Sequence, residues 1–254
     1  MYRLLIKPII LWFSTHRVRK IMLIWLYIVG KVPIIRRITP AIYRSDYPLL
    51  EREVFGVKFA NPIGLAAGFD HNGDVIDGLQ SIGLGFVEIG TITAESERAN
   101  PAPNHFALPK DRAMIYRTGH PNRGWRYAIN NLRRRPSGVI VGCSISRNGN
   151  TSYRDAGREI LKSFRNLYQY TDYFTVVVNF DQIAISNDSS LSEELTKILT
   201  PLIEFRRGQS EYRPIMLKIT PDLSRQQLDD VISVLISSPL DGIVAVAGSE
   251  SREG

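Results

Sequence analysis

Short runs of apolar residues alternate along this chain with longer stretches in which apolar residues recur every three or four positions. The short runs lie at about 62–67, 85–90, 138–143, 174–179, 214–219 and 242–247. Runs of this length, bounded by turn residues, are typical of buried parallel strands. Helical spacing occupies the segments between them, most clearly 155–168, 190–206 and 224–237. The pattern therefore predicts six strands that alternate with helices.

One strand–helix–strand unit, from Asn61 to Thr93, is clearer than the others. Its first strand leads into a polar turn that begins at Gly68, and its second strand ends in Gly90 and Thr91. Parallel neighbours need a crossover of this kind, because the chain must return before the next strand starts. Small residues at the carboxyl ends of both strands let a ligand approach the backbone, so this edge is a candidate binding site.

Six such strands are most of a (β/α)8 barrel, whose usual size is about 250 residues. We therefore predict an α/β fold of the TIM-barrel type over residues 49–254, incomplete, with about six of eight strands. Residues 49–60 predict a small hairpin that closes the bottom of the barrel, and residues 94–137 are expected to be irregular. An open barrel leaves two sheet edges exposed, and we expect a protein partner or an oligomer to cover them.

Residues 1–48 form a basic and apolar extension. They hold nine Lys or Arg and one Asp, so the rest of the chain is close to neutral within a net charge of +7. Their longest apolar run, 21–29, is shorter than the roughly 20 residues that span a bilayer. Two short amphipathic helices with Trp and Tyr anchors would lie in the interface of an anionic membrane. The alternative is a helical pair packed on the body; an arm this apolar is not expected to bind nucleic acid.

Cysteine and histidine are scarce. The single cysteine, Cys143, excludes an intrachain disulfide, and we expect it to be a small buried residue at a strand end. His71 and His120 are expected to lie near one another at the mouth of the barrel. No carboxylate accompanies them at metal-ligand spacing, so we expect no metal site.

Two motifs carry a family resemblance: GLAAGFDHNG at 64–73 and GFVEIGTIT at 85–93. They resemble GLAAGFDKNG and GFVEIGTVT of the class 2 dihydroorotate dehydrogenases, the quinone-linked and membrane-associated class. The resemblance runs from about Leu50 to the C-terminus and more loosely through the extension. It implies FMN-dependent oxidation of dihydroorotate to orotate in pyrimidine biosynthesis, with a quinone as electron acceptor. It also implies a peripheral position on the cytoplasmic face of a bacterial inner membrane, with the extension forming the quinone tunnel.

The resemblance assigns roles to residues at the strand ends. Lys218, in IMLKITPDL, matches a lysine that contacts the flavin, and Asn179 matches an asparagine that reaches substrate and flavin. The matched backbone along the flavin is that of Ala66, Ala67, Gly68, Gly90 and Thr91. The alternatives are a structural ion pair for Lys218, a strand-end cap for Asn179 and tight packing for the small residues.

Departures from the family concentrate where substrate binds. The catalytic serine position is occupied by Gln182, which cannot act as a base. Asp181 lies one residue away, and its side chain would point to the other side of an extended segment. Other replacements are His71 for a lysine, and Tyr116, Pro121, Ser144 and Ala247 for asparagines. The phosphate site of such barrels follows strands seven and eight, which this sequence is not expected to form.

Three hypotheses follow: a dihydroorotate dehydrogenase with a degraded active site, a catalytically inactive membrane-bound relative that serves in binding or assembly, and a remnant without a stable fold.

Overall fold

A six-stranded parallel sheet forms the centre of the molecule. The structure is a computed structural model, and it describes residues 15–44, 47–101, 105–108, 111, 113–178, 180, 190–246 and 248–249. The strands run in the order β3–β4–β7–β8–β9–β10, and every neighbouring pair is parallel. Their bounds are Gly64–Leu65, Phe86–Ile92, Ile140–Ile145, Tyr173–Val177, Ile215–Lys218 and Gly242–Val244. The six predicted strands are confirmed, and the outermost two are shorter than expected.

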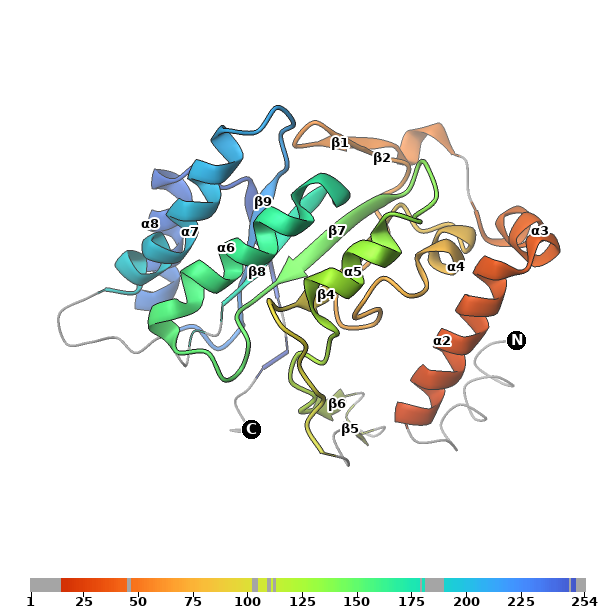
Figure 1. Cartoon of the computed structure of the whole chain (residues 1–254), viewed down its shortest axis with the longest axis horizontal. Helices are drawn as coiled ribbons and strands as arrows, with labels where there is room; N and C mark the ends of the chain where they lie inside the picture. The colour runs from red at the N-terminus through yellow and green to blue at the C-terminus, as the bar shows by residue number, and fades with distance from the viewer. Residues whose placement is uncertain are drawn as a thin grey trace.

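Helices follow the strands in alternation and lie along one side of the sheet (Figure 1). They are α4 (Ile76–Ser81), α5 (Gly124–Leu132), α6 (Ala156–Leu167), α7 (Leu191–Arg207) and α8 (Arg225–Ser237). Short 3-10 turns occupy Pro48–Leu50, Tyr153–Asp155 and Tyr168–Tyr170. The fold is an incomplete barrel of the TIM type, six strands with their helices, and a helical extension precedes it.

Local capping explains why the last two helices begin where the sequence predicts. The Ser190 hydroxyl accepts a hydrogen bond from the Glu193 N–H, and the Glu193 side chain bonds back to the Ser190 backbone. Ser224 and Gln227 make the same reciprocal pair at the start of α8. Such capping boxes satisfy N–H groups that a helix start otherwise leaves unpaired, so both starts are encoded locally.

The core lies between the sheet and the helices. Alternate residues of the strands point to this side and are fully buried: Val87, Ile89, Val141, Cys143, Ile145, Phe174, Val176, Ile215 and Leu217. Ile89 is in register with Cys143, and Cys143 with Phe174, so these side chains form rows across the sheet. Phe164 of α6 packs on Phe174 with ring centroids 4.5 Å apart. The burial predicted for Cys143 is confirmed.

The other face of the sheet is filled at its amino end by aromatic rings. The hairpin of β1 (Arg52–Val54) and β2 (Val57–Phe59) brings Phe59 to 5.5 Å from the Phe86 ring, centroid to centroid. Tyr173 packs edge-on against Phe86 at 6.3 Å. A Cβ at Gly142 would overlap the Tyr173 ring at 2.0 Å, so glycine makes room for it. The predicted hairpin is present.

The segment 94–137, predicted to be irregular, is not. It contains a second hairpin, β5 (His105–Leu108) paired with β6 (Ala113–Tyr116), and the helix α5. Ala128, Ile129 and Leu132 bury the inner face of α5. The polar residues between them hid this helical face from a reading of the sequence.

Two helices of the extension are described: α2 (Thr15–Lys31) and α3 (Pro33–Tyr43). The two helices of the extension were predicted over the apolar runs 4–13 and 21–29. The first run lies outside the described residues, the second lies within α2, and no helix was predicted over α3. α2 packs on α4, and a Cβ at Gly78 would lie 2.1 Å from the Leu26 carbonyl oxygen. The Lys31 ammonium lies 3.3 Å from the Asp77 carboxylate. The extension therefore does pack on the body, through one side of α2.

Candidate active site

The carboxyl ends of β3 and β4 present open backbone. Ala66 and Gly68 are exposed, whereas Gly90 and Thr91 are buried beside them. Gly68 has φ +106°, and no atom lies within 4 Å of the position that a Cβ would take there. The Gly68 N–H donates to the Gly90 carbonyl over 2.9 Å. The structure thus brings all five predicted backbone positions together, with Ala67 half-buried between Ala66 and Gly68.

Asp70 organises the turn that follows. Its buried carboxylate accepts hydrogen bonds from the N–H groups of Asn72, Asp74 and Val75, at 3.3, 2.9 and 2.9 Å. Burial raises the pKa of this carboxyl, and the three N–H groups oppose that rise. The turn is therefore stiffened from within, which fixes the position of His71.

Lys218 ends β9 as predicted and is half-buried. Among the described residues no carboxylate lies within 4.0 Å of its ammonium, and no hydrogen bond to it is found. The structural ion pair considered for it is therefore not formed within that part of the chain. A partly desolvated ammonium without a partner is costly, and an anionic or carbonyl-rich ligand would relieve that cost.

Glu88 is a residue that the sequence analysis missed. It lies on β4, is 4% exposed, and accepts a hydrogen bond from the Thr175 hydroxyl over 3.0 Å. Its other oxygen, Oε1, is buried without a partner. Burial raises the pKa of the Glu88 carboxyl, while Thr175 and the nearby Lys218 charge lower it. A charged residue inside the apolar run Phe86–Ile92 was the signal available in the sequence.

A hydroxyl group of β4 and one of β7 face each other near the ends of these neighbouring strands. The Ser144 and Thr91 hydroxyl oxygens lie 3.0 Å apart, and both residues are buried. Ser144 stands where the resemblance places a substrate-binding asparagine. Its hydroxyl is thus engaged by the protein itself.

Two asparagine side chains, Asn122 and Asn148, hold the loops at this end of the sheet. Asn122 donates to the Thr93 hydroxyl over 2.8 Å and to the His120 carbonyl over 2.7 Å. Asn148 donates to the same hydroxyl over 3.1 Å and to the Glu95 carbonyl over 3.1 Å. These amide N–H groups therefore join the loop after β4 to the loops before α5 and after β7.

Three histidines gather at this end of the sheet, as predicted for His71 and His120. Burial lowers the pKa of His71 most, the charges of Arg19, His120 and His105 add to this effect, and together they bring the pKa to about 4. Burial also lowers the pKa of His120. Both rings are therefore neutral at pH 7. Within the described ranges no group of three or more His, Cys, Asp or Glu side chains is arranged to hold a metal ion.

Several predicted site residues lie outside the described residues. They are Asn179, Gln182, Asp181 and Ala247. Their predicted roles stay predictions.

Comparison with known proteins gives a consistent picture. A family model described as dihydroorotate dehydrogenase matches residues 49–253. Three curated relatives share the name dihydroorotate dehydrogenase (quinone). That of Christiangramia forsetii is 33% identical over 254 residues, which is 100% of this chain and 74% of the relative. That of Bordetella avium is 35% identical and covers 82% of this chain and 62% of its own. That of Corynebacterium diphtheriae is 34% identical and covers 95% of this chain and 65% of its own.

Solved structures agree on the fold. DHODH from Eimeria tenella matches with a TM-score of 0.78 in two crystal structures. The complex with ferulenol is 23% identical and covers 94% of this chain and 68% of that chain. The ligand-free form is 25% identical and covers 93% of this chain and 70% of that chain.

Proposed function

We infer that this chain, which belongs to the dihydroorotate dehydrogenase family, binds FMN at the carboxyl ends of β3, β4 and β9. The observation that carries this inference is the Lys218 ammonium, which lacks a partner among the described residues, at the same edge of the sheet as the open backbone of Ala66 and Gly68. Lys218 follows the core residue Leu217 on β9, so its side chain lies on the face of the sheet away from the helices, as does that of Glu88 beside Val87 and Ile89.

The residues present fit the isoalloxazine ring of a flavin. An isoalloxazine ring needs flat, unobstructed backbone on one side, and the space beside Gly68 is free of atoms to 4 Å. It also needs a cation near N1 and the C2 carbonyl, where charge develops on reduction, and Lys218 is available for that role. When bound, FMN would supply the hydride acceptor for the oxidation of a substrate.

We propose that the substrate is dihydroorotate and that the electrons pass to a quinone, as the names of the relatives indicate. In this reaction the chain binds the substrate beside the flavin, and the C5 proton leaves to solvent water, because glutamine cannot act as a base. The position of the proton acceptor is held by Gln182, and the asparagine position on β7 by Ser144, whose hydroxyl already bonds to Thr91. Each lost amide contact to substrate removes roughly 0.5–1.5 kcal/mol. Substrate recognition is therefore weak.

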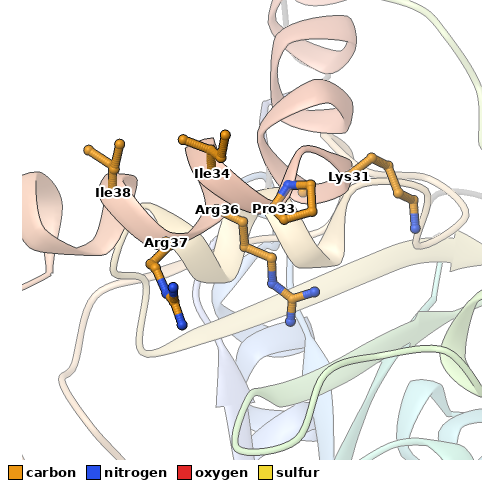
Figure 2. Close-up of a pocket in the computed structure, with 7 residues that line it drawn as sticks. Lys31, Pro33, Ile34, Arg36, Arg37 and Ile38 are labelled. Atoms are coloured by element: carbon orange, nitrogen blue, oxygen red, sulfur yellow. The ribbon is translucent and has the colours of Figure 1, made fainter.

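The extension supports a peripheral membrane position. Six large apolar residues of α2 are exposed: Ile21, Met22, Ile24, Trp25, Tyr27 and Ile28. On α3, Ile34 and Ile38 project to one side and Arg36 and Arg37 to the other (Figure 2). Residues 15–44 contain no Asp or Glu. No helix among the described residues is long and apolar enough to cross a bilayer. An amphipathic, basic helical pair of this kind lies in the interface of an anionic membrane, on the cytoplasmic face of a bacterial inner membrane by analogy with its family.

A second candidate is a membrane-bound relative that binds flavin or a protein partner without turnover. The observation that favours it is the engagement of Ser144 by Thr91 at a substrate position, together with Gln182 in place of a base. The two candidates share the fold and the extension, and they differ in what happens when substrate is added.

The test is a flavin experiment on detergent-purified protein. After incubation with FMN and gel filtration, a visible flavin band should elute with the protein. Dihydroorotate added without oxygen should then bleach the band slowly, and Gln182→Ser should bleach it faster. A folded protein that elutes colourless would contradict flavin binding. A bound flavin that dihydroorotate reduces in neither protein would favour the second candidate.

A further inference from the structure

Arg19 of α2 reaches across to the polar turn at the edge of the sheet. Its Nη2 donates to the Phe69 carbonyl over 2.6 Å, and its guanidinium carbon lies 6.0 Å from the centroid of the Phe69 ring. Hydrogen bonds from a charged donor are about twice as strong as neutral ones. Arg19 thus bonds the outer helix directly to the backbone of the turn.

The same turn is bonded to β4 on its other side. The Gly68 N–H donates to the Gly90 carbonyl over 2.9 Å, and the Gly90 N–H donates to the Asp70 carbonyl over 3.0 Å. Residues 68–70 are therefore held between β4 and Arg19. Any movement of the Phe69 carbonyl changes the place of Gly68, whose open side we assign to the flavin.

Within the part of the chain that the structure describes, Arg19 makes the one side-chain hydrogen bond between α2 and residues 68–75. A cavity of about 340 Å³ separates the two, and Arg19, Leu23 and Tyr27 line it from the helix while Phe69, His71 and Val75 line it from the turn. No carboxylate of the described residues lies within 4.0 Å of the Arg19 guanidinium. The guanidinium is half-buried with a backbone carbonyl as its hydrogen-bond acceptor, so its contact spans an otherwise open gap.

We propose that Arg19 is a positioning residue that couples the seating of α2 to the backbone at Gly68 and Gly90. The coupling rests on the proposed function, in which α2 lies on the membrane and this backbone holds the flavin. When α2 is packed on the body, Arg19 donates to the Phe69 carbonyl, and the hydrogen bond from the Gly68 N–H to the Gly90 carbonyl stays formed. When α2 moves away from the body, the Phe69 carbonyl loses its donor, and the hydrogen bond between Gly68 and Gly90 breaks more often.

The pKa of His71 gives a second measurement of the contact made by Arg19. Lys20 from α2 and Asp70 and Asp74 from the turn line the same cavity. Arg19, together with His105 and His120, opposes protonation of His71. Removing Arg19 should therefore raise the pKa of His71, which ring NMR signals report without any ligand.

Hydrogen exchange on the full chain in detergent, without flavin, tests the contact. We expect Arg19→Met to speed exchange of the Gly68 and Gly90 amides about tenfold, because a charged hydrogen bond is worth at least the 1.4 kcal/mol that tenfold represents. Lys20→Met is the matched control, because Lys20 is exposed and adjacent on the same helix. Arg19→Lys, which keeps the cation but loses the fork of donors, should fall between them.

The amide of Phe174, bonded to the Pro214 carbonyl in the core, is the reference. Equal exchange at Gly68 and Gly90 in Arg19→Met and Lys20→Met would overturn the proposal. Acceleration of Phe174 by the same factor would also overturn it, because the effect would then be a general loss of stability.

Vesicles containing phosphatidylglycerol test the membrane step. They should slow exchange at Gly68 and Gly90 in the parent chain but not in Arg19→Met. Equal slowing in both chains would overturn the coupling. If the parent does not bind vesicles, the membrane part of the proposed function fails, and the vesicle-free comparison still decides whether Arg19 holds the turn.

Discussion

The hydroxyl oxygens of Thr91 and Ser144 lie 3.0 Å apart, with both residues buried where β4 and β7 end. Each hydroxyl can serve as donor or acceptor, so the pair satisfies two polar groups that no water reaches easily. Ser144 stands where the resemblance places a substrate-binding asparagine, and its hydroxyl is engaged by the protein's own hydrogen bonding.

Loss of one member of this pair should destabilise the fold. We expect Ser144→Ala to lower the free energy of unfolding by about 1–3 kcal/mol, because the Thr91 hydroxyl is left buried and unpaired. Adding Thr91→Val should recover most of that loss, since both polar groups are then gone. Urea unfolding of the two single variants and the double variant measures the coupling. Additive losses in the double variant would contradict the pairing.

Lys218 should contribute to flavin affinity without contributing to stability. Lys218→Met is expected to weaken FMN binding about tenfold or more, because the flavin loses a charged hydrogen-bond donor. The free energy of unfolding should stay constant or rise, since an ammonium without a partner among the described residues is removed. Quenching of FMN fluorescence measures the affinity, with Lys58→Met on the exposed face of β2 as control. Unchanged affinity would remove Lys218 from the site.

Glu88 should make stability depend on pH in a defined direction. Its folded-state pKa is raised above 4.5, so the folded chain holds the proton to higher pH than the unfolded chain. This contribution is present below pH 4.5 and is lost as the pH rises through the raised pKa. Glu88→Gln should therefore be more stable than the parent at pH 7, and the difference should shrink toward pH 4.5.

His71 acts in the opposite sense, because its folded pKa is lowered from 6.5 to about 4. Its contribution to stability is present above pH 6.5 and falls as the pH drops toward 4. Comparing parent and Glu88→Gln at each pH cancels this effect. Glu51→Gln, on an exposed residue, is the control. A difference that does not change with pH would show that Glu88 does not titrate as inferred.

Docking of the extension depends on Gly78. A Cβ there would lie 2.1 Å from the Leu26 carbonyl, so Gly78→Ala should push α2 away from α4 at a cost of about 1–3 kcal/mol. Trypsin should then cut faster after Arg17 and Lys20. Gly208→Ala is the control, because its nearest neighbour, the Phe205 carbonyl oxygen, lies at 3.6 Å. Equal cleavage of both variants would contradict this contact.

Membrane affinity should reside in α3 as well as α2. Ile34 and Ile38 are 72% and 54% exposed. Changing both to Asn should lower binding to vesicles containing phosphatidylglycerol at least about tenfold, because each isoleucine that enters the membrane contributes about 1.5–3 kcal/mol. Ile236→Asn on α8, where the side chain is 82% exposed, should leave flotation unchanged. A comparable loss in that control would mean that general hydrophobicity drives binding.

Helices at the end of the chain were predictable to within a residue or two, whereas in the extension the apolar run 21–29 marked α2 and no pattern marked α3. The helix predicted at 224–237 is α8, Arg225–Ser237, because Ser224 and Gln227 encode its start locally. α3 was missed because its isoleucines lie on a face that the body does not cover, and Pro40 interrupts the helical signal. A pattern that assumes burial cannot find such a helix.

The sequence alone determined the order of strands and helices and the family, because apolar periodicity, capping pairs and two long motifs are local properties of the chain. Only the tertiary structure decided what the polar residues do. Glu88 and Thr175 lie 87 positions apart, and Arg19 and Phe69 lie 50 apart. Their contacts exist because the side chains of Glu88 on β4 and Thr175 on β8 lie on the same face of the sheet, and because α2 packs beside the turn. Whether a buried charge finds a partner depends on such distant neighbours, which periodicity does not encode.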